Sequence, residues 1–223
     1  MLTGPPTTLD PSGIEVLTDE LCASLPTPPG RLIVGIAGVP GAGKSTLAAM
    51  LVERVNERFP HSAVVLPMDG FHLSNAQLDA MKLRDRKGSP PTFDAAAFVT
   101  TLRRAFHGEC FAFPVYDRAL HEPVVRDEPS QSLTSDTQLV ITEGNYLLLD
   151  EQPWNELASV LQKAWLIQVS PELAMQRLVA RHIAGGRSPA DALAHYRRND
   201  ELNATLMLKQ SRRADRVLAW PAE

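Results

Sequence analysis

Short runs of apolar residues alternate with longer amphipathic stretches along most of the chain. The runs are four to six residues long and are bounded by polar residues, glycine or proline, which is typical of buried strands. Five strands are predicted in this way. They cover residues 32–37, 63–66, 139–142, 164–169 and 216–219.

The amphipathic stretches between these strands predict helices. In residues 44–58, Leu47, Leu51 and Val55 recur at the spacing that places them on one helical face. Parallel strands need such crossover helices, so the pattern predicts an α/β domain with a mostly parallel sheet. The other helices are expected at residues 77–83, 95–107, 154–162, 171–183 and 189–208.

The first thirty residues differ from the rest in composition. Residues 1–30 hold six of the 18 prolines. Within them, Ile14, Leu17 and Leu21 recur at helical spacing, which predicts a short helix between two proline-rich stretches. We therefore expect an N-terminal segment over residues 1–30 and a main domain over residues 31–223.

Composition narrows the class of protein. Of the 223 residues, 44% are hydrophobic and 22% are charged, which excludes a disordered, collagen-like or disulfide-scaffold protein. The longest apolar run is far below the ~20 residues that span a bilayer, and the opening residues resemble no secretory signal. Two cysteines suit free thiols, and a net charge of −4 argues against a nucleic-acid partner. The expectation is a cytoplasmic protein without a membrane or nucleic-acid partner.

A glycine-rich segment directly follows the first predicted strand. Residues 38–45 fit the phosphate-binding pattern G-x-x-x-x-G-K-[ST] at every position. Glycines let backbone N–H groups approach phosphate oxygens, and the next helix adds the positive end of its dipole. Lys44 would reach the β- and γ-phosphates, and Ser45 would bind Mg²⁺. The expected nucleotide-contacting residues are Gly38, Gly41, Ala42, Gly43, Lys44, Ser45, Thr46 and, outside this segment, Arg187.

Two carboxylates follow predicted strands at the edge where an open parallel sheet binds ligands. Asp69 follows residues 63–66, and Glu143 follows residues 139–142. A nucleotide-bound Mg²⁺ needs an acidic ligand, and an acceptor hydroxyl needs a carboxylate to take its proton. We assign Asp69 to the hydroxyl and Glu143 to the metal. The reverse assignment remains open, as does a simple capping role for either residue.

Arginine is concentrated toward the C-terminus. Residues 177–216 contain nine Lys or Arg against four Asp or Glu. Arg177 and Arg181 lie one helical turn apart just before Gly185-Gly186, and Arg187 follows. A lid that closes on a transferring phosphoryl group needs such residues. A solvated helical face is the alternative interpretation.

Six segments together resemble the P-loop kinases grouped with phosphoribulokinase, uridine kinase and bacterial pantothenate kinase. The resemblance is strongest to the bacterial branch labelled nucleoside/nucleotide kinase-like or fructose transport system kinase-like, and it covers about residues 30–219. The phosphate loop is generic, whereas the second and fifth segments are more specific. The segments are GIAGVPGAGKST (35–46), MDGFH (68–72), RKGSPPTFD (86–94), FPVYDRALHEP (113–123), ITEGNYLLLD (141–150) and RLVARHIAGGRS (177–188).

The resemblance implies a P-loop NTPase fold like that of nucleoside monophosphate kinases. The fold would have three layers, α/β/α, with a mostly parallel five-stranded sheet in the middle and a lid at about residues 181–190. It implies ATP and Mg²⁺ as cosubstrates and an alcohol group of a small molecule as the phosphoryl acceptor. It also allows a homodimer. The acceptor class stays open among sugars, sugar phosphates, nucleosides and pantothenate-like vitamins. The alternative is a nucleotide-binding regulatory NTPase that has no small-molecule acceptor.

The resemblance also implies roles for individual residues. Asp69 matches the catalytic aspartate, and Arg181 matches the lid arginine, with Arg177 beside it. Arg118 stands where pantothenate kinases have histidine, and D-G-F-H replaces the D-S-F-Y of uridine kinases, so both of those substrates are doubtful. The residues expected to face the acceptor are His72, Arg84, Tyr116, Arg118, His121, Asn199 and Asn203.

Overall fold

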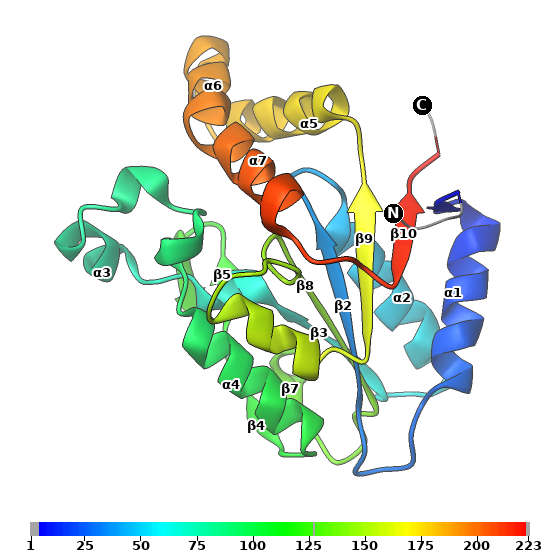
Figure 1. Cartoon of the computed structure of the whole chain (residues 1–223). Helices are drawn as coiled ribbons and strands as arrows, with labels where there is room; N and C mark the ends of the chain where they lie inside the picture. Colours follow the sequence, from blue (N-terminus) through cyan, green and yellow to red (C-terminus); the bar gives the residue numbers. More distant parts are fainter. Residues whose placement is uncertain (1–4, 127, 222–223) are drawn as a thin grey trace.

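A six-stranded parallel sheet forms the centre of the protein (Figure 1). The structure is a computed structural model that describes residues 5–126 and 128–221, so the outer ends of the predicted units, residues 1–4 and 222–223, lie outside the described residues. The strand order is β1-β10-β9-β2-β8-β3. The strands are β1 (Thr7–Thr8), β2 (Leu32–Gly38), β3 (Ala63–Pro67), β8 (Leu139–Gly144), β9 (Lys163–Gln168) and β10 (Arg216–Ala219).

The five predicted strands are confirmed to within two residues at each end. Every residue of β2 and of β8 is buried, since helices cover both faces of the sheet, which is why these strands read as continuous apolar runs. The expected strand count of five was wrong. The sixth strand, β1, is two threonines that pair with Leu218 and Ala219 of β10, and so short a polar pair carries no apolar signal.

Helices cover the sheet on two sides, which confirms the three-layer α/β/α architecture (Figure 1). On one side, α1 (Pro11–Ala23) and α2 (Lys44–Arg58) pack against Leu32, Val34 and Ile36 of β2. On the other side, α4 (Ala95–Phe106) packs with Ile33 and Ala37. Alternate residues of one strand therefore serve two separate hydrophobic cores.

The N-terminal segment takes part in the core. Asp10 caps α1 by accepting a 2.7 Å hydrogen bond from the Gly13 N–H. Leu17 and Leu21 of α1 are fully buried in the same cluster as Leu51 of α2. On the surface, Glu15 pairs with Arg54 at 2.6 Å. Residues from β1 to α1 are thus attached to the sheet edge and to α2.

Two helical predictions need correction. Residues 154–162, expected as an α-helix, form a 3₁₀ helix over Trp154–Ser159 that seals the core beside α4. Residues 189–208, expected as one α-helix, form α6 (Pro189–His195), a π-helical segment (Tyr196–Asp200) and α7 (Glu201–Gln210). Apolar periodicity cannot detect one wider turn within a helix.

The remaining elements are helices and short strands outside the central sheet. The predicted helix 77–83 is α3 (Asn75–Ala80), which stands on an arm beside the sheet, and the predicted helix 171–183 is α5 (Pro171–Ala184) (Figure 1). Short antiparallel pairs join β4 (Phe111–Ala112) to β7 (Ser132–Leu133) and β5 (Val115–Asp117) to β6 (Glu122–Val124). Other 3₁₀ turns cover Met68–Phe71, Arg84–Arg86, Pro90–Thr92 and Pro129–Gln131.

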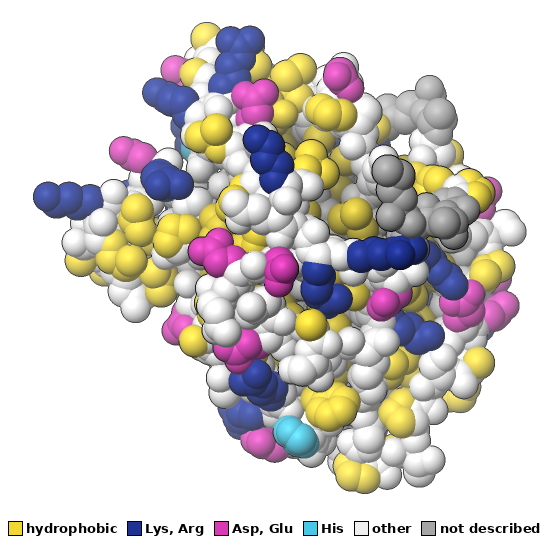
Figure 2. Space-filling model, in the orientation of Figure 1, with side chains coloured by type: hydrophobic (Ala, Val, Ile, Leu, Met, Phe, Trp, Pro, Cys, Tyr) yellow, Lys and Arg dark blue, Asp and Glu magenta, His cyan; other side chains and the backbone are white. Residues whose placement is uncertain are grey.

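The predicted lid, at about residues 181–190, falls on the end of α5, the turn after it and the start of α6, above the carboxyl end of β9 (Figure 1). We refer to α5, α6 and the π-helical segment together as the lid. Lys and Arg side chains are spread over this face of the molecule, including the lid and the arm that carries α3 (Figure 2). Within the described residues, no helix is both long enough and apolar enough to cross a membrane.

Candidate active site

One cavity of about 1630 Å³ lies between the phosphate loop, the lid and the arm that carries α3. It collects side chains that are far apart in the sequence, because each follows a strand or stands on a segment that faces the strand ends. All predicted site residues line this cavity except Gly38 and Ala42. Those two instead form the base of the loop, where a Cβ on Gly38 would lie 3.1 Å from the Ala42 Cβ.

The phosphate loop has the backbone geometry that anion binding requires. Gly41 has φ +80° and Gly43 has φ +87°, a conformation that favours glycine. Gly43 is the N-cap of α2 and supplies no capping side chain, so the first N–H groups of α2 face the cavity. A phosphate group fits this cradle, and the loop therefore suits a nucleotide.

Lys44 is held inside the cavity by two neutral acceptors. Its Nζ donates to the Val39 carbonyl at 3.1 Å and to Asn145 Oδ1 at 2.8 Å. The residue is only 8% exposed. Burial lowers the pKa of Lys44, and the carboxylates of Glu143 and Asp69 oppose that shift. Among the described residues, both hydrogen-bond partners of the buried ammonium group are neutral.

Ser45 and Glu143 form a pair of oxygen donors beside Lys44. Ser45 Oγ donates to Glu143 Oε1 at 2.9 Å. Burial raises the pKa of Glu143, and the nearby charge of Asp69 raises it further, whereas Lys44 and Ser45 act in the opposite direction. A hydroxyl group and a carboxylate are hard ligands of the kind that Mg²⁺ prefers, so this pair fits the metal of a nucleotide.

Asp69 lies across the cavity, in the 3₁₀ turn that follows β3. Its side chain is 40% exposed, toward the cavity. The backbone carbonyl of Asp69 lies 2.9 Å from His72 Nδ1, and the His72 ring contacts Phe93 and Tyr116 at centroid distances of 4.0 and 4.8 Å. Burial lowers the pKa of His72, which leaves its imidazole neutral near pH 7. Asp69 is therefore an accessible carboxylate beside a rigid aromatic wall.

The loop before α4 forms another wall of the cavity. Lys87 Nζ donates to Asn75 Oδ1 at 2.8 Å and to the His121 carbonyl at 2.7 Å. Asn199 and Tyr146 hold the same loop by donating to the carbonyls of Lys87 and Gly88 at 2.9 and 2.6 Å. Asn199 thus positions this wall, in addition to lining the cavity as predicted.

The predicted acceptor residues differ in how freely they face the cavity. Arg84 pairs at 3.2 Å with Asp79 on α3, near the rim. Asn203 is buried in α7 and lines the cavity. Arg118 lines the cavity and acts electrostatically on both Glu143 and Arg181.

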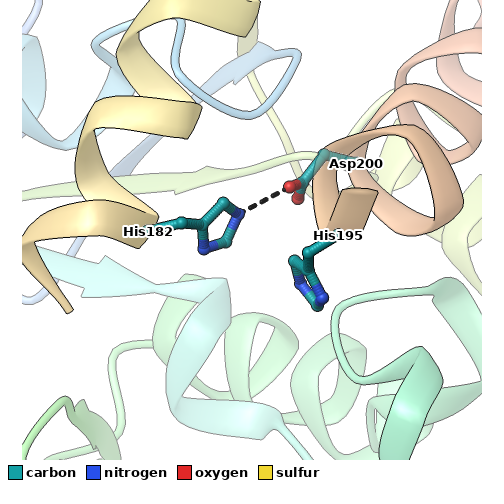
Figure 3. Close-up of side chains that lie close together, drawn as sticks. All are labelled: His182, His195 and Asp200. Carbon is teal, nitrogen blue, oxygen red and sulfur yellow. Dashed lines mark hydrogen bonds and ion pairs between the residues drawn. The ribbon is translucent and has the colours of Figure 1, made fainter. Parts of the chain in front are cut away.

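The lid contributes three arginines and a cluster of two histidines and one aspartate. Arg177, Arg181 and Arg187 all line the cavity. Burial lowers the pKa of Arg181, and Arg118 lowers it further by like-charge repulsion. Beside Arg181, His182 Nε2 lies 2.8 Å from Asp200 Oδ2, with His195 nearby (Figure 3).

The cavity residues that sequence reasoning missed include Asn145, His182, His195, Asp200 and Trp220. Trp220 Nε1 donates to the Ala42 carbonyl at 2.9 Å, so the indole closes one side of the phosphate loop. Asn145 stands in the E-G-N-Y segment and His182 stands in the segment at residues 177–188, so the resemblance was the available signal for both. His195, Asp200 and Trp220 carry no motif, because their grouping depends on how the chain turns after β9 and β10.

Comparisons with known proteins agree on one family. The Phosphoribulokinase / Uridine kinase family profile matches residues 33–219. An uncharacterised Escherichia coli protein, YggC, is 39% identical over 208 residues, covering 92% of this chain and 85% of YggC. The Schizosaccharomyces pombe protein C227.14, provisionally described as a uridine kinase, is 36% identical over 201 residues, covering 84% of this chain and 83% of that protein.

A solved structure agrees in fold along nearly its whole length. It is a Silicibacter sp. TM1040 protein provisionally described as a fructose transport system kinase. Its TM-score is 0.83 at 33% sequence identity, with 93% of this chain and 98% of that chain covered.

The burial of Lys44 generates a prediction about stability and pH. Because the folded-state pKa of Lys44 lies below its unfolded value, the charged lysine destabilises the fold at neutral pH. That cost is relieved as pH rises through the folded-state pKa toward the unfolded value near ~10.4. The free energy of unfolding of the wild type should therefore rise relative to that of Lys44→Met between about pH 7 and about pH 10. Urea denaturation of both proteins measures this difference, and a constant or falling difference would contradict it.

Proposed function

Because this chain belongs to the phosphoribulokinase and uridine kinase family and is a P-loop kinase, we propose that it transfers the γ-phosphoryl group of ATP to a small-molecule hydroxyl group. The supporting observation is that one cavity joins the phosphate loop to a second wall bearing the accessible carboxylate of Asp69. A donor site and an acceptor site that share a water-poor space are what phosphoryl transfer requires.

On the donor side, the loop N–H groups and Lys44 would bind the phosphates. Ser45 Oγ and Glu143, 2.9 Å apart, would hold the Mg²⁺ of the nucleotide. When bound, this ion supplies positive charge to the phosphate oxygens. The raised pKa of Glu143 supports this role, because a bound cation would stabilise the buried carboxylate.

On the acceptor side, Asp69 would orient the hydroxyl group and accept its proton. His72 stays neutral and fixed against Phe93 and Tyr116, so it can shape the pocket without competing for that proton. Arg86 and Arg118 also line the cavity, and a guanidinium fork pairs well with carboxylate or phosphate. We therefore favour an acceptor that carries an anionic group.

A panel of acceptors tests the proposal. The whole chain is incubated with ATP and Mg²⁺ and with sugars, sugar phosphates, nucleosides or hydroxy acids, and ADP formation is followed by a coupled assay. We expect ADP release to depend on one acceptor class, with the phosphorylated product seen by mass spectrometry. Slow ATP hydrolysis that is independent of every acceptor would instead support a regulatory NTPase.

Replacing Asp69 separates proton transfer from metal binding. Asp69→Asn keeps the size of the side chain but removes its basicity, so kcat should fall by roughly 10² or more while KM for ATP changes little. Asp136→Asn, an exposed aspartate outside the cavity, is the matched control and should retain activity. If ATP·Mg²⁺ affinity collapses and kcat at saturation survives, the roles of Asp69 and Glu143 are reversed.

Replacing Arg181 tests the lid. Lysine keeps the charge but loses the planar fork, so Arg181→Lys should lower kcat by about tenfold or more. Arg213→Lys is the control, because Arg213 is exposed and lies outside the cavity. Steady-state kinetics with the same acceptor compare the two, and equal small effects would mean that the lid arginine does not contact the phosphoryl group.

A further inference from the structure

Three residues of the lid bring metal-binding atoms together beside the proposed kinase site. His182 lies in the last turn of α5, His195 ends α6, and Asp200 ends the π-helical segment (Figure 3). One ligand atom from each lies within 4.8 Å of the other two. His182 Nε2 and Asp200 Oδ2 are 2.8 Å apart, and the two imidazole rings are 4.7 Å apart at 78°. The three side chains thus face one small space.

The chain path explains why these residues meet. The turn at Gly185-Gly186 reverses the chain, so that the end of α5 lies against α6 and the π-helical segment. The wider π turn leaves Arg197 and Arg198 exposed while burying Asp200 on the inner side. Single π turns inside helices occur frequently at functional sites.

We propose that His182, His195 and Asp200 bind a divalent transition metal ion, with Zn²⁺ the best match to these ligands. Two imidazoles and one carboxylate are a common set of three protein ligands for zinc, which leaves the fourth position of a tetrahedral site open. All three residues line the cavity, so that fourth position faces its interior, where a water molecule or a ligand oxygen can reach it.

The surrounding charges select among metals. Arg187 and Arg198 act on His195, and Arg181 acts electrostatically with Asp200. These cations oppose any ion that is held by charge alone, as Mg²⁺ or Ca²⁺ would be. Zn²⁺ forms strong bonds to imidazole nitrogen and gains less of its affinity from net charge, so it is retained where Mg²⁺ is not.

The bound ion would connect the helical segments of the lid to each other. It would join the end of α5 to α6 and to the π-helical segment, directly beside Arg181 in the chain. The site is defined by its ligands and does not depend on the identity of the reaction, so it can be tested without any kinase assay.

Metal binding by the whole chain tests the site directly. The protein is purified without a histidine tag, stripped with a chelator and dialysed against Zn²⁺, and bound zinc is counted by mass spectrometry. We expect one ion per chain, undisplaced by excess Mg²⁺, and a Tm higher by about 5 °C or more when free Zn²⁺ is a hundredfold above Kd. Co²⁺, used as a probe, should develop the visible absorption of a tetrahedral site.

Variants locate the ion. His195→Ala and Asp200→Asn should each weaken zinc binding at least tenfold and abolish the rise in Tm, whereas His107→Ala, an exposed histidine outside the cluster, should bind like the wild type. Circular dichroism and Tm in chelator establish that each variant is folded. The proposal is overturned if the wild type binds no zinc, or if folded His195→Ala and Asp200→Asn bind it as tightly as the wild type.

Discussion

Parallel pairing of the central strands is the constraint on which the rest of this structure depends. Strand β2 lies between β8 and β9, and all strands of the sheet run in one direction, so every strand ends at the same edge. The segments that follow β2, β3, β8, β9 and β10 therefore meet there. They bring the phosphate loop, Asp69, Asn145, the lid and Trp220 to one cavity. Because helices bury both faces of these strands, a change in strand order or register would displace several of these groups together.

The cavity concentrates buried charges of both signs. Lys44 and Glu143 are almost fully buried, and burial moves the pKa of each toward its neutral form. Arg118 and Arg181 repel each other across the same space. An anionic phosphate chain with its cation would satisfy both sets, since it offers negative charge to Lys44 and the arginines and positive charge to Glu143. The same electrostatic conflict that costs stability thus favours binding of a charged nucleotide.

The lid presents two different chemistries from neighbouring positions. Arg181 and His182 are adjacent on α5. Arg181 interacts electrostatically with Asp69 and Arg118 as well as with Asp200, whereas His182 lies at hydrogen-bond distance from Asp200. A metal ion that connects α5 to α6 and to the π-helical segment would fix the direction in which Arg181 projects. The proposed metal site and the proposed phosphoryl transfer thus both involve α5.

The sequence by itself determined five strands of the sheet and the phosphate loop. Apolar runs identified five strands, because burial on both faces leaves a local signal, and the motif at residues 38–45 identified the loop, because phosphate binding needs contiguous residues. Only the tertiary structure decided the rest. The two threonines of β1 are a strand only because β10 offers an unpaired edge, and Asp200 turns inward only because a π turn shifts the helix. The contacts of Lys44 with Asn145 and of His182 with Asp200 join residues whose distance in space depends on chain reversals, which no local pattern of residues encodes.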